Sequence, residues 1–156
     1  MRSLNFWAIA LLAFSSAATA AAQTQVLNIV PPARLTIQRA EPVTAKLHLQ
    51  LREGYHVNSN TPSDEYMIPL RLTWDAGPLE AREVIFPKPS FEKYEFAEKP
   101  LSVFTGEFEI ATKLAAKANA PSGLGILIGK LRYQACNSKM CLPPKTLDVK
   151  QTYEIK

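Results

Sequence analysis

The sequence lacks an apolar run long enough for a transmembrane helix, a block of like charges and the paired ligand spacing of a zinc site. Its longest apolar run, residues 6–14 (FWAIALLAF), is too short for the roughly 20 residues of a transmembrane helix. Basic and acidic residues are interspersed, so the net charge of +4 gives little basis for nucleic-acid or membrane binding. His48 and His56 lie far from the two cysteines, without the paired ligand spacing of a zinc site. We therefore expect no metal, no cofactor and no nucleic-acid partner.

The N-terminus has the three regions of a secretory signal peptide. Arg2 supplies the positive charge, the apolar run follows, and small residues then allow cleavage after Ala20 or Ala22. No cysteine directly follows the apolar run, which excludes an anchor of the bacterial lipoprotein kind. The sequence predicts a signal peptide over residues 1–22 and one exported domain over residues 23–156, in a compartment where disulfides persist.

Short apolar runs separated by prolines predict an all-β sandwich. The chain has 12 prolines and 6 glycines, and no segment shows the period of a long helix. Gly106 is interpreted as a bulge within a strand, residues 88–100 as irregular, and residues 113–120 as a possible helical turn. We expect about eight strands in a single domain, at residues 26–30, 43–51, 55–58, 68–74, 79–86, 101–114, 124–133 and 146–155.

Cys136 and Cys141 are the most informative residues of the chain. Four residues separate them, and closing so short a loop stabilises a fold by about 2 kcal/mol, against about 5 for a loop of about a hundred residues. A bridge placed only for stability would gain more by joining distant strands. Lys139 and Lys145 would favour a thiolate if they lie near the sulfurs. Composition and spacing leave a redox centre and a structural bridge both open.

The residues around the cysteines resemble a known family. The segment 133–145, YQAC followed by four residues and CLPPK, is similar to the active-site strand pair of the N-terminal periplasmic domain of the thiol:disulfide interchange protein DsbD. Upstream, residues 54–58 (GYHVN), 86–87 (FP) and 94–96 (YEF) also resemble that family. The resemblance implies an immunoglobulin-like sandwich in the periplasm, with the two cysteines on adjacent strands.

The resemblance also implies a route of electron transfer. In the family, this domain receives electrons from a membrane domain through a thioredoxin-like domain. It passes them to oxidised periplasmic partners, including disulfide isomerases and thioredoxins of cytochrome c maturation. If the family's roles are carried over to this sequence, Cys141 is the sulfur that attacks the partner, or is attacked by it, to give the mixed disulfide. Cys136 is then the sulfur that resolves this mixed disulfide. The sequence contains neither of the other two domains, so we expect a separate membrane protein to supply the electrons.

Residues near the site depart from the family pattern. Tyr94, Glu95 and Phe96 match a cap loop whose phenylalanine shields the disulfide, although Tyr94 stands where an acid is common. Packing of Phe96 on the sandwich edge remains an equal alternative. His56 and Asn58 stand where the family has tyrosines, and strand alternation places both on one face, near the cysteines. His56 is either a modulator of a thiolate or a surface residue.

Two functions of different classes follow. The first is a periplasmic thiol–disulfide exchange domain that relays electrons through Cys136 and Cys141. The second is a non-enzymatic immunoglobulin-like binding or accessory module in which the same disulfide is structural. Resistance to reduction separates them, because structural disulfides usually have potentials below about −300 mV.

Overall fold

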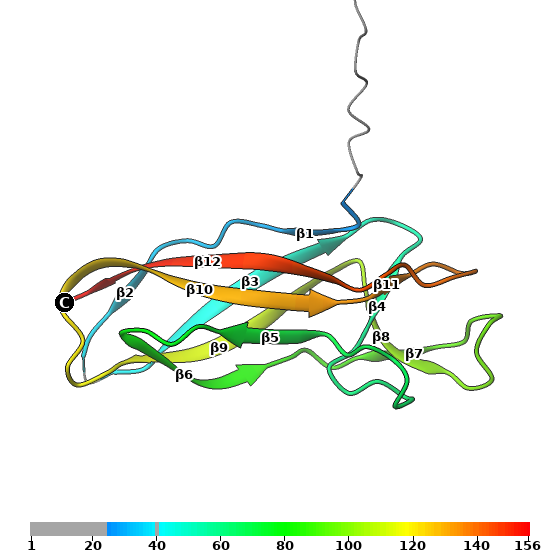
Figure 1. The fold of residues 1–156 in the computed structure, drawn as a ribbon, viewed down its shortest axis with the longest axis horizontal. Helices are drawn as coiled ribbons and strands as arrows, with labels where there is room; N and C mark the ends of the chain where they lie inside the picture. Colours follow the sequence, from blue (N-terminus) through cyan, green and yellow to red (C-terminus); the bar gives the residue numbers. More distant parts are fainter. Residues whose placement is uncertain (1–24, 40) are drawn as a thin grey trace, which may run out of the picture.

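The described chain is all-β. The computed structural model describes residues 25–39 and 41–156, so the signal peptide predicted for residues 1–22 lies outside the described residues. Twelve strands form three sheets of four strands each, arranged along one elongated sandwich (Figure 1). The all-β class expected from the sequence is confirmed.

Two of the sheets form the layers of the sandwich. The first has the order β1-β3-β9-β6 and consists of β1 (Leu27–Ile29), β3 (Val43–Leu51), β9 (Glu107–Ala116) and β6 (Leu79–Ile85). The second has the order β2-β12-β10-β5 and consists of β2 (Leu35–Ile37), β12 (Lys145–Ile155), β10 (Gly123–Tyr133) and β5 (Arg71–Trp74). Only β2 and β12 pair in parallel, whereas the other neighbours in these two sheets are antiparallel.

The third sheet extends the sandwich at the end opposite the C-terminus (Figure 1). It has the order β11-β4-β8-β7 and consists of β11 (Ala135–Cys136), β4 (His56–Asn58), β8 (Leu101–Thr105) and β7 (Ser90–Glu92). Three of its strands are direct continuations of the layers, because β4 follows β3, β8 precedes β9 and β11 follows β10. Strands from both layers therefore meet in one small sheet.

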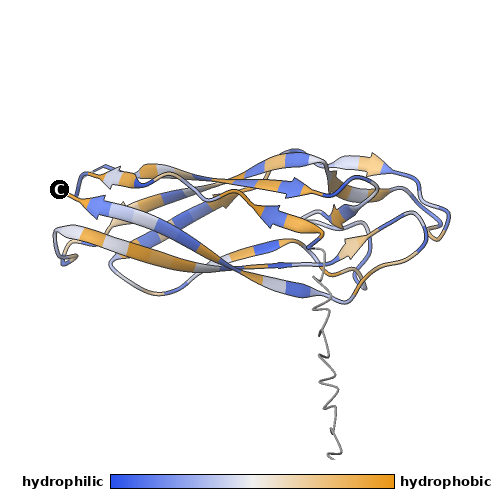
Figure 2. Cartoon of the chain, turned by 90° about the horizontal axis from the view of Figure 1, so that it is seen from above, coloured by the Kyte–Doolittle hydropathy of each residue, from blue (hydrophilic) through white to orange (hydrophobic). Residues whose placement is uncertain are grey.

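Alternation along the strands builds the core. In β3 the residues from Ala45 to Leu51 alternate strictly between buried and exposed, with the apolar side chains buried, and Figure 2 shows the same banding along neighbouring strands. Leu49, Ile110 and Leu131 come from different strands and are at most 1% exposed. Each such side chain contributes about 1.5–3 kcal/mol by leaving water, which holds the two layers together.

Three local expectations were wrong. Residues 101–114 are not one bulged strand, because Gly106, at a φ of 61°, separates β8 in the third sheet from β9 in the first. The left-handed region costs glycine little, so the chain can change sheets there. The stretch 88–100 contains β7, and β9 runs to Ala116 before a turn in which the Ala120 N–H donates to the Lys117 carbonyl (3.0 Å). The short strands β2 and β11 were not anticipated.

Gly129 allows β5 to lie close against β10. A Cβ at this position would lie 2.6 Å from Cε3 of Trp74 and 2.9 Å from the carbonyl oxygen of Thr73. The indole is held in place because its Nε1 donates to Oγ1 of Thr112 (3.1 Å). We expect Gly129→Ala to lower the free energy of unfolding by about 1–3 kcal/mol, measured by urea denaturation. Gly77→Ala, whose Cβ would meet nothing within 4 Å, is the control, and equal losses in both variants would contradict this account.

Candidate functional site

The two cysteines are joined in a disulfide beside β11, an edge strand of the third sheet. Cys136 ends β11, and Cys141 forms an isolated antiparallel bridge with it, with the Cα atoms 3.9 Å apart. The two halves differ in accessibility, since Cys136 is 1% exposed whereas Cys141 is exposed. Of the two residues, Cys141 is therefore the one at the surface, whereas Cys136 is enclosed by the fold.

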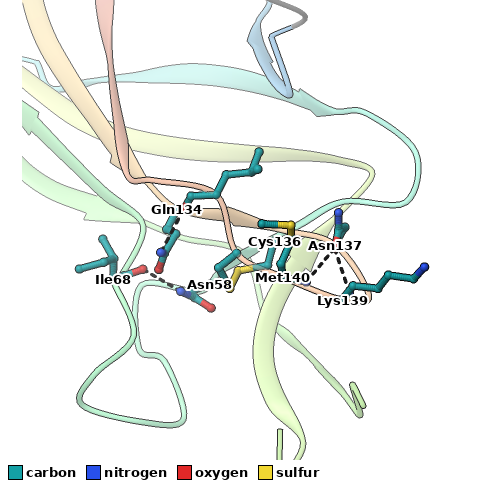
Figure 3. Close-up of a disulfide and its surroundings, with 9 residues drawn as sticks. Asn58, Ile68, Gln134, Cys136, Asn137, Lys139 and Met140 are labelled. Atoms are coloured by element: carbon teal, nitrogen blue, oxygen red, sulfur yellow. Dashed lines mark hydrogen bonds between the residues drawn. A yellow bond between two sulfur atoms is a disulfide. The ribbon is translucent and has the colours of Figure 1, made fainter. Parts of the chain in front are cut away.

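Hydrogen bonds within the loop give it a defined shape. Oδ1 of Asn137 accepts from the backbone N–H groups of Lys139 and Met140, both at 2.9 Å, which is the Asx-turn that asparagine favours. At the base of the loop, Nε2 of Gln134 donates to the carbonyl of Leu142 at 3.1 Å. Figure 3 shows these bonds, with the Lys139 side chain directed away from the disulfide. The loop is thus held by its own backbone and amide groups.

His56 lies directly opposite Cys136, because the two residues are partners in the β4–β11 ladder. Val57 belongs to the core, so the neighbouring His56 points to the other face of the third sheet, and cross-strand partners share a face. The imidazole is 2% exposed, and its Nε2 is buried without a hydrogen-bond partner. Of the two expectations for this histidine, a surface position is therefore wrong.

Burial sets the charge of this histidine. Desolvation lowers the pKa of His56, and the carboxylate of Glu92 opposes the change without reversing it. The imidazole is therefore neutral at neutral pH, with one nitrogen carrying a proton and the other free to accept one. A neutral, buried imidazole beside a sulfur pair is a group that can take up a proton.

Tyr94 and Phe96 stack over His56. The ring centroids lie 4.0 Å apart for His56 and Tyr94, 5.7 Å for Tyr94 and Phe96, and 6.5 Å for His56 and Phe96. The Tyr94 hydroxyl donates to Oε2 of Glu92 at 2.6 Å, and burial together with this hydrogen bond raises the pKa of Tyr94. Phe96 is 42% exposed. Tyr94 therefore makes the inner contact with His56, and Phe96 forms the outer layer.

Asn58 and Glu95 have other surroundings. Asn58 shares the face of His56 by alternation and is 2% exposed, but its Nδ2 donates to the carbonyl of Ile68 at 3.0 Å (Figure 3). This hydrogen bond connects β4 to the segment that leads to β5. Glu95 is exposed on the turn between Tyr94 and Phe96. The structure brings His56, Tyr94 and Phe96 together, and leaves Glu95 at the surface.

Two residues of the site were missed at the level of sequence. Thr105 is the partner of His56 on the side away from Cys136, in the β4–β8 ladder. Glu92 holds the Tyr94 hydroxyl and lines, with His56 and Ser138, a groove of about 550 Å³ beside the disulfide loop. The alternation of residues 90–92 (SFE) was the available signal for β7, but three residues are too few to stand out among prolines.

The described part of the chain offers little besides the sulfur pair and its neighbours for chemistry. In residues 25–39 and 41–156, no three His, Cys, Asp or Glu side chains gather into a potential metal site. In the same residues, no helix has the length and hydropathy to cross a membrane. The arrangement that remains is a half-exposed disulfide with a buried neutral imidazole at its protected half, under two stacked aromatic rings.

Comparison with known proteins agrees with this geometry. The family described as thiol:disulfide interchange protein DsbD, N-terminal, matches residues 23–152, while no curated protein sequence matches. The reduced N-terminal domain of DsbD from Neisseria meningitidis has 19% identity and a TM-score of 0.50, over 82% of this chain and 90% of that one. The N-terminal periplasmic domain of ScsB from Proteus mirabilis has 18% identity and a TM-score of 0.51, over 80% of this chain and 44% of that one. These similarities confirm the immunoglobulin-like sandwich.

Proposed function

The chain belongs to the family of DsbD N-terminal domains, and on that basis we propose that it exchanges electrons with partner proteins through Cys136 and Cys141. The observation that carries the proposal is the unequal burial of the two bonded cysteines, with Cys136 at 1% exposure and Cys141 exposed. Exchange needs one sulfur that a partner can reach and a second that resolves the mixed disulfide. In this proposal Cys141 is the sulfur that the partner reaches and Cys136 the one that resolves.

The proposed reaction has two steps. In the reduced domain, the thiolate of Cys141 attacks one sulfur of a partner disulfide, which forms a mixed disulfide and releases the partner's other sulfur as a thiolate. Cys136 then loses its proton and attacks Sγ of Cys141, which breaks the mixed disulfide. The partner leaves with two thiols and two more electrons, and the domain is left with the Cys136–Cys141 disulfide. The same steps in reverse reduce the domain again.

We further propose where this exchange takes place and with which proteins. A signal peptide over residues 1–22 would export a mature domain of residues 23–156 to the periplasm, where the similar ScsB domain is located. Its oxidised partners would be thioredoxin-like or disulfide isomerase proteins, as the family resemblance implies, and we propose a separate membrane protein as its donor. Residues 94–96 would act as the cap that such partners displace, with His56 and Asn58 beneath or beside it.

The reduction potential of the Cys136–Cys141 pair tests this function. We expect a value in the range of known exchange proteins, about −270 to −120 mV, from equilibration in glutathione or dithiothreitol buffers followed by alkylation and mass spectrometry. A potential below about −300 mV, or a disulfide that dithiothreitol does not reduce in the folded protein, would overturn the proposal. Either result would support the alternative of an accessory module with a structural bridge.

A further inference from the structure

We propose that His56 accepts the proton of Cys136 when Cys136 resolves the mixed disulfide. The inference rests on the proposed exchange function and assigns a role that this function leaves open. Resolution requires the thiolate, because the thiol is not the nucleophile. Cys136 is buried, so its proton needs an acceptor inside the protein.

The geometry provides that acceptor. His56 is the ladder partner of Cys136, and opposing side chains on one sheet face have Cβ atoms about 4.5–5.5 Å apart. Nε2 of His56 is buried and unpaired in the oxidised protein, an arrangement that is costly for a polar atom. A disulfide sulfur has no hydrogen to donate, whereas the thiol of reduced Cys136 has one. Reduction would thus supply the missing partner of Nε2.

The surroundings of His56 keep its imidazole neutral, so that it can accept a proton, and they stabilise the imidazolium that forms. Desolvation lowers the pKa of His56, so the ring is neutral at neutral pH. The titratable or charged groups around it are Cys136 on β11, Tyr94 stacked on it and Glu92 on β7, together with Arg52, Glu53 and Tyr55, which line the same groove. The Glu92 carboxylate favours the imidazolium, and the hydroxyl of Thr105 on β8 does not titrate.

The step balances without another reactant. The proton of the Cys136 thiol moves to the imidazole of His56, and the sulfur lone pair of Cys136 forms a bond to Sγ of Cys141. The bond between Cys141 and the partner sulfur breaks, and its electron pair leaves with the partner sulfur as a thiolate. The imidazolium then returns the proton to that thiolate or to water in the groove that His56 lines. His56 ends the step unchanged.

Reaction of the reduced protein with 5,5′-dithiobis(2-nitrobenzoate) separates the two steps. The first release of thionitrobenzoate reports attack by Cys141, and the second reports resolution by Cys136. His56→Phe preserves a ring beneath Tyr94 but has no proton acceptor. We expect the second phase to slow about 100-fold at pH 7, at the lower end of the range of general-base effects, with the first phase unchanged. The variant's second phase should keep rising towards the pKa of a thiol, about 8.5, whereas the wild-type phase levels off at lower pH.

Controls make the result decisive. His56→Gln is a second variant in case phenylalanine disturbs folding, which circular dichroism would show. His48→Phe is the matched control, because this exposed histidine on β3 contacts Glu109 (3.2 Å) and belongs to another sheet. If both His56 variants resolve with the wild-type rate and pH profile, the inference is overturned while the exchange function stands. If the wild-type protein shows no second phase, or its disulfide cannot be reduced, both are overturned.

Discussion

Cys136→Ala should accumulate as a mixed disulfide with an oxidised partner, whereas Cys141→Ala should react about 100-fold more slowly, because thiol exchange depends on access to the sulfur. In the first variant the exposed Cys141 attacks and nothing resolves the product. In the second, the only remaining thiol is that of Cys136, which is 1% exposed in the oxidised protein and faces His56 across the ladder. The reaction should therefore stop at different stages in the two variants.

Mass spectrometry after incubation with oxidised glutathione measures this difference as the fraction of protein that carries a glutathione adduct. The two variants control for each other, because each loses the same short-loop disulfide, worth about 2 kcal/mol of stability. Cys136→Ala also removes a buried sulfur, so thermal unfolding should first show that both variants are folded at the temperature of the assay. Equal adduct formation, or faster reaction of Cys141→Ala, would contradict the assignment of Cys141 as the attacking sulfur.

Tyr94→Ala should speed the reduction of the disulfide by dithiothreitol about tenfold, and Phe96→Ala only about twofold. An aromatic contact contributes about 0.5–1.5 kcal/mol beyond its buried area, and losing the larger value shifts a closed cap towards the open state about tenfold. Tyr94 stacks on His56 at 4.0 Å and is hydrogen-bonded to Glu92, while Phe96 lies 6.5 Å from the imidazole. The inner ring should therefore hold the cap more strongly than the outer one.

Phe91→Ala is the matched control for the cap variants. Phe91 lies on β7 close to the same loop, is 69% exposed, and alternation turns it away from the face shared by Glu92 and His56. Its removal should leave the rate of reduction unchanged, as followed by alkylation at timed intervals. If Tyr94→Ala also reduces at the wild-type rate, the aromatic residues only pack on the sandwich edge, and the proposed cap role fails.

Much of the fold could be predicted from the sequence because strand alternation is a local signal. Residues 43–51 form β3 with the expected bounds, and their apolar residues face the core as expected. The predicted strand bounds were wrong where pairing with a strand distant in sequence decides whether a segment forms a strand, and in which sheet. The change of sheet at Gly106 and the short strand β7 exist because β8 pairs with β4 and β7, and such pairing leaves little trace in the local pattern.

The sequence alone determined that two cysteines could meet, since a disulfide between Cys136 and Cys141 closes within one short loop. Only the tertiary structure decided that one cysteine is buried and the other exposed, and that His56 lies beside the buried one under Tyr94. Alternation states which face of a strand a side chain occupies, but not which strand lies next to it. The antiparallel pairing of β11 with β4 supplies that neighbour, and with it the proton acceptor proposed for the site.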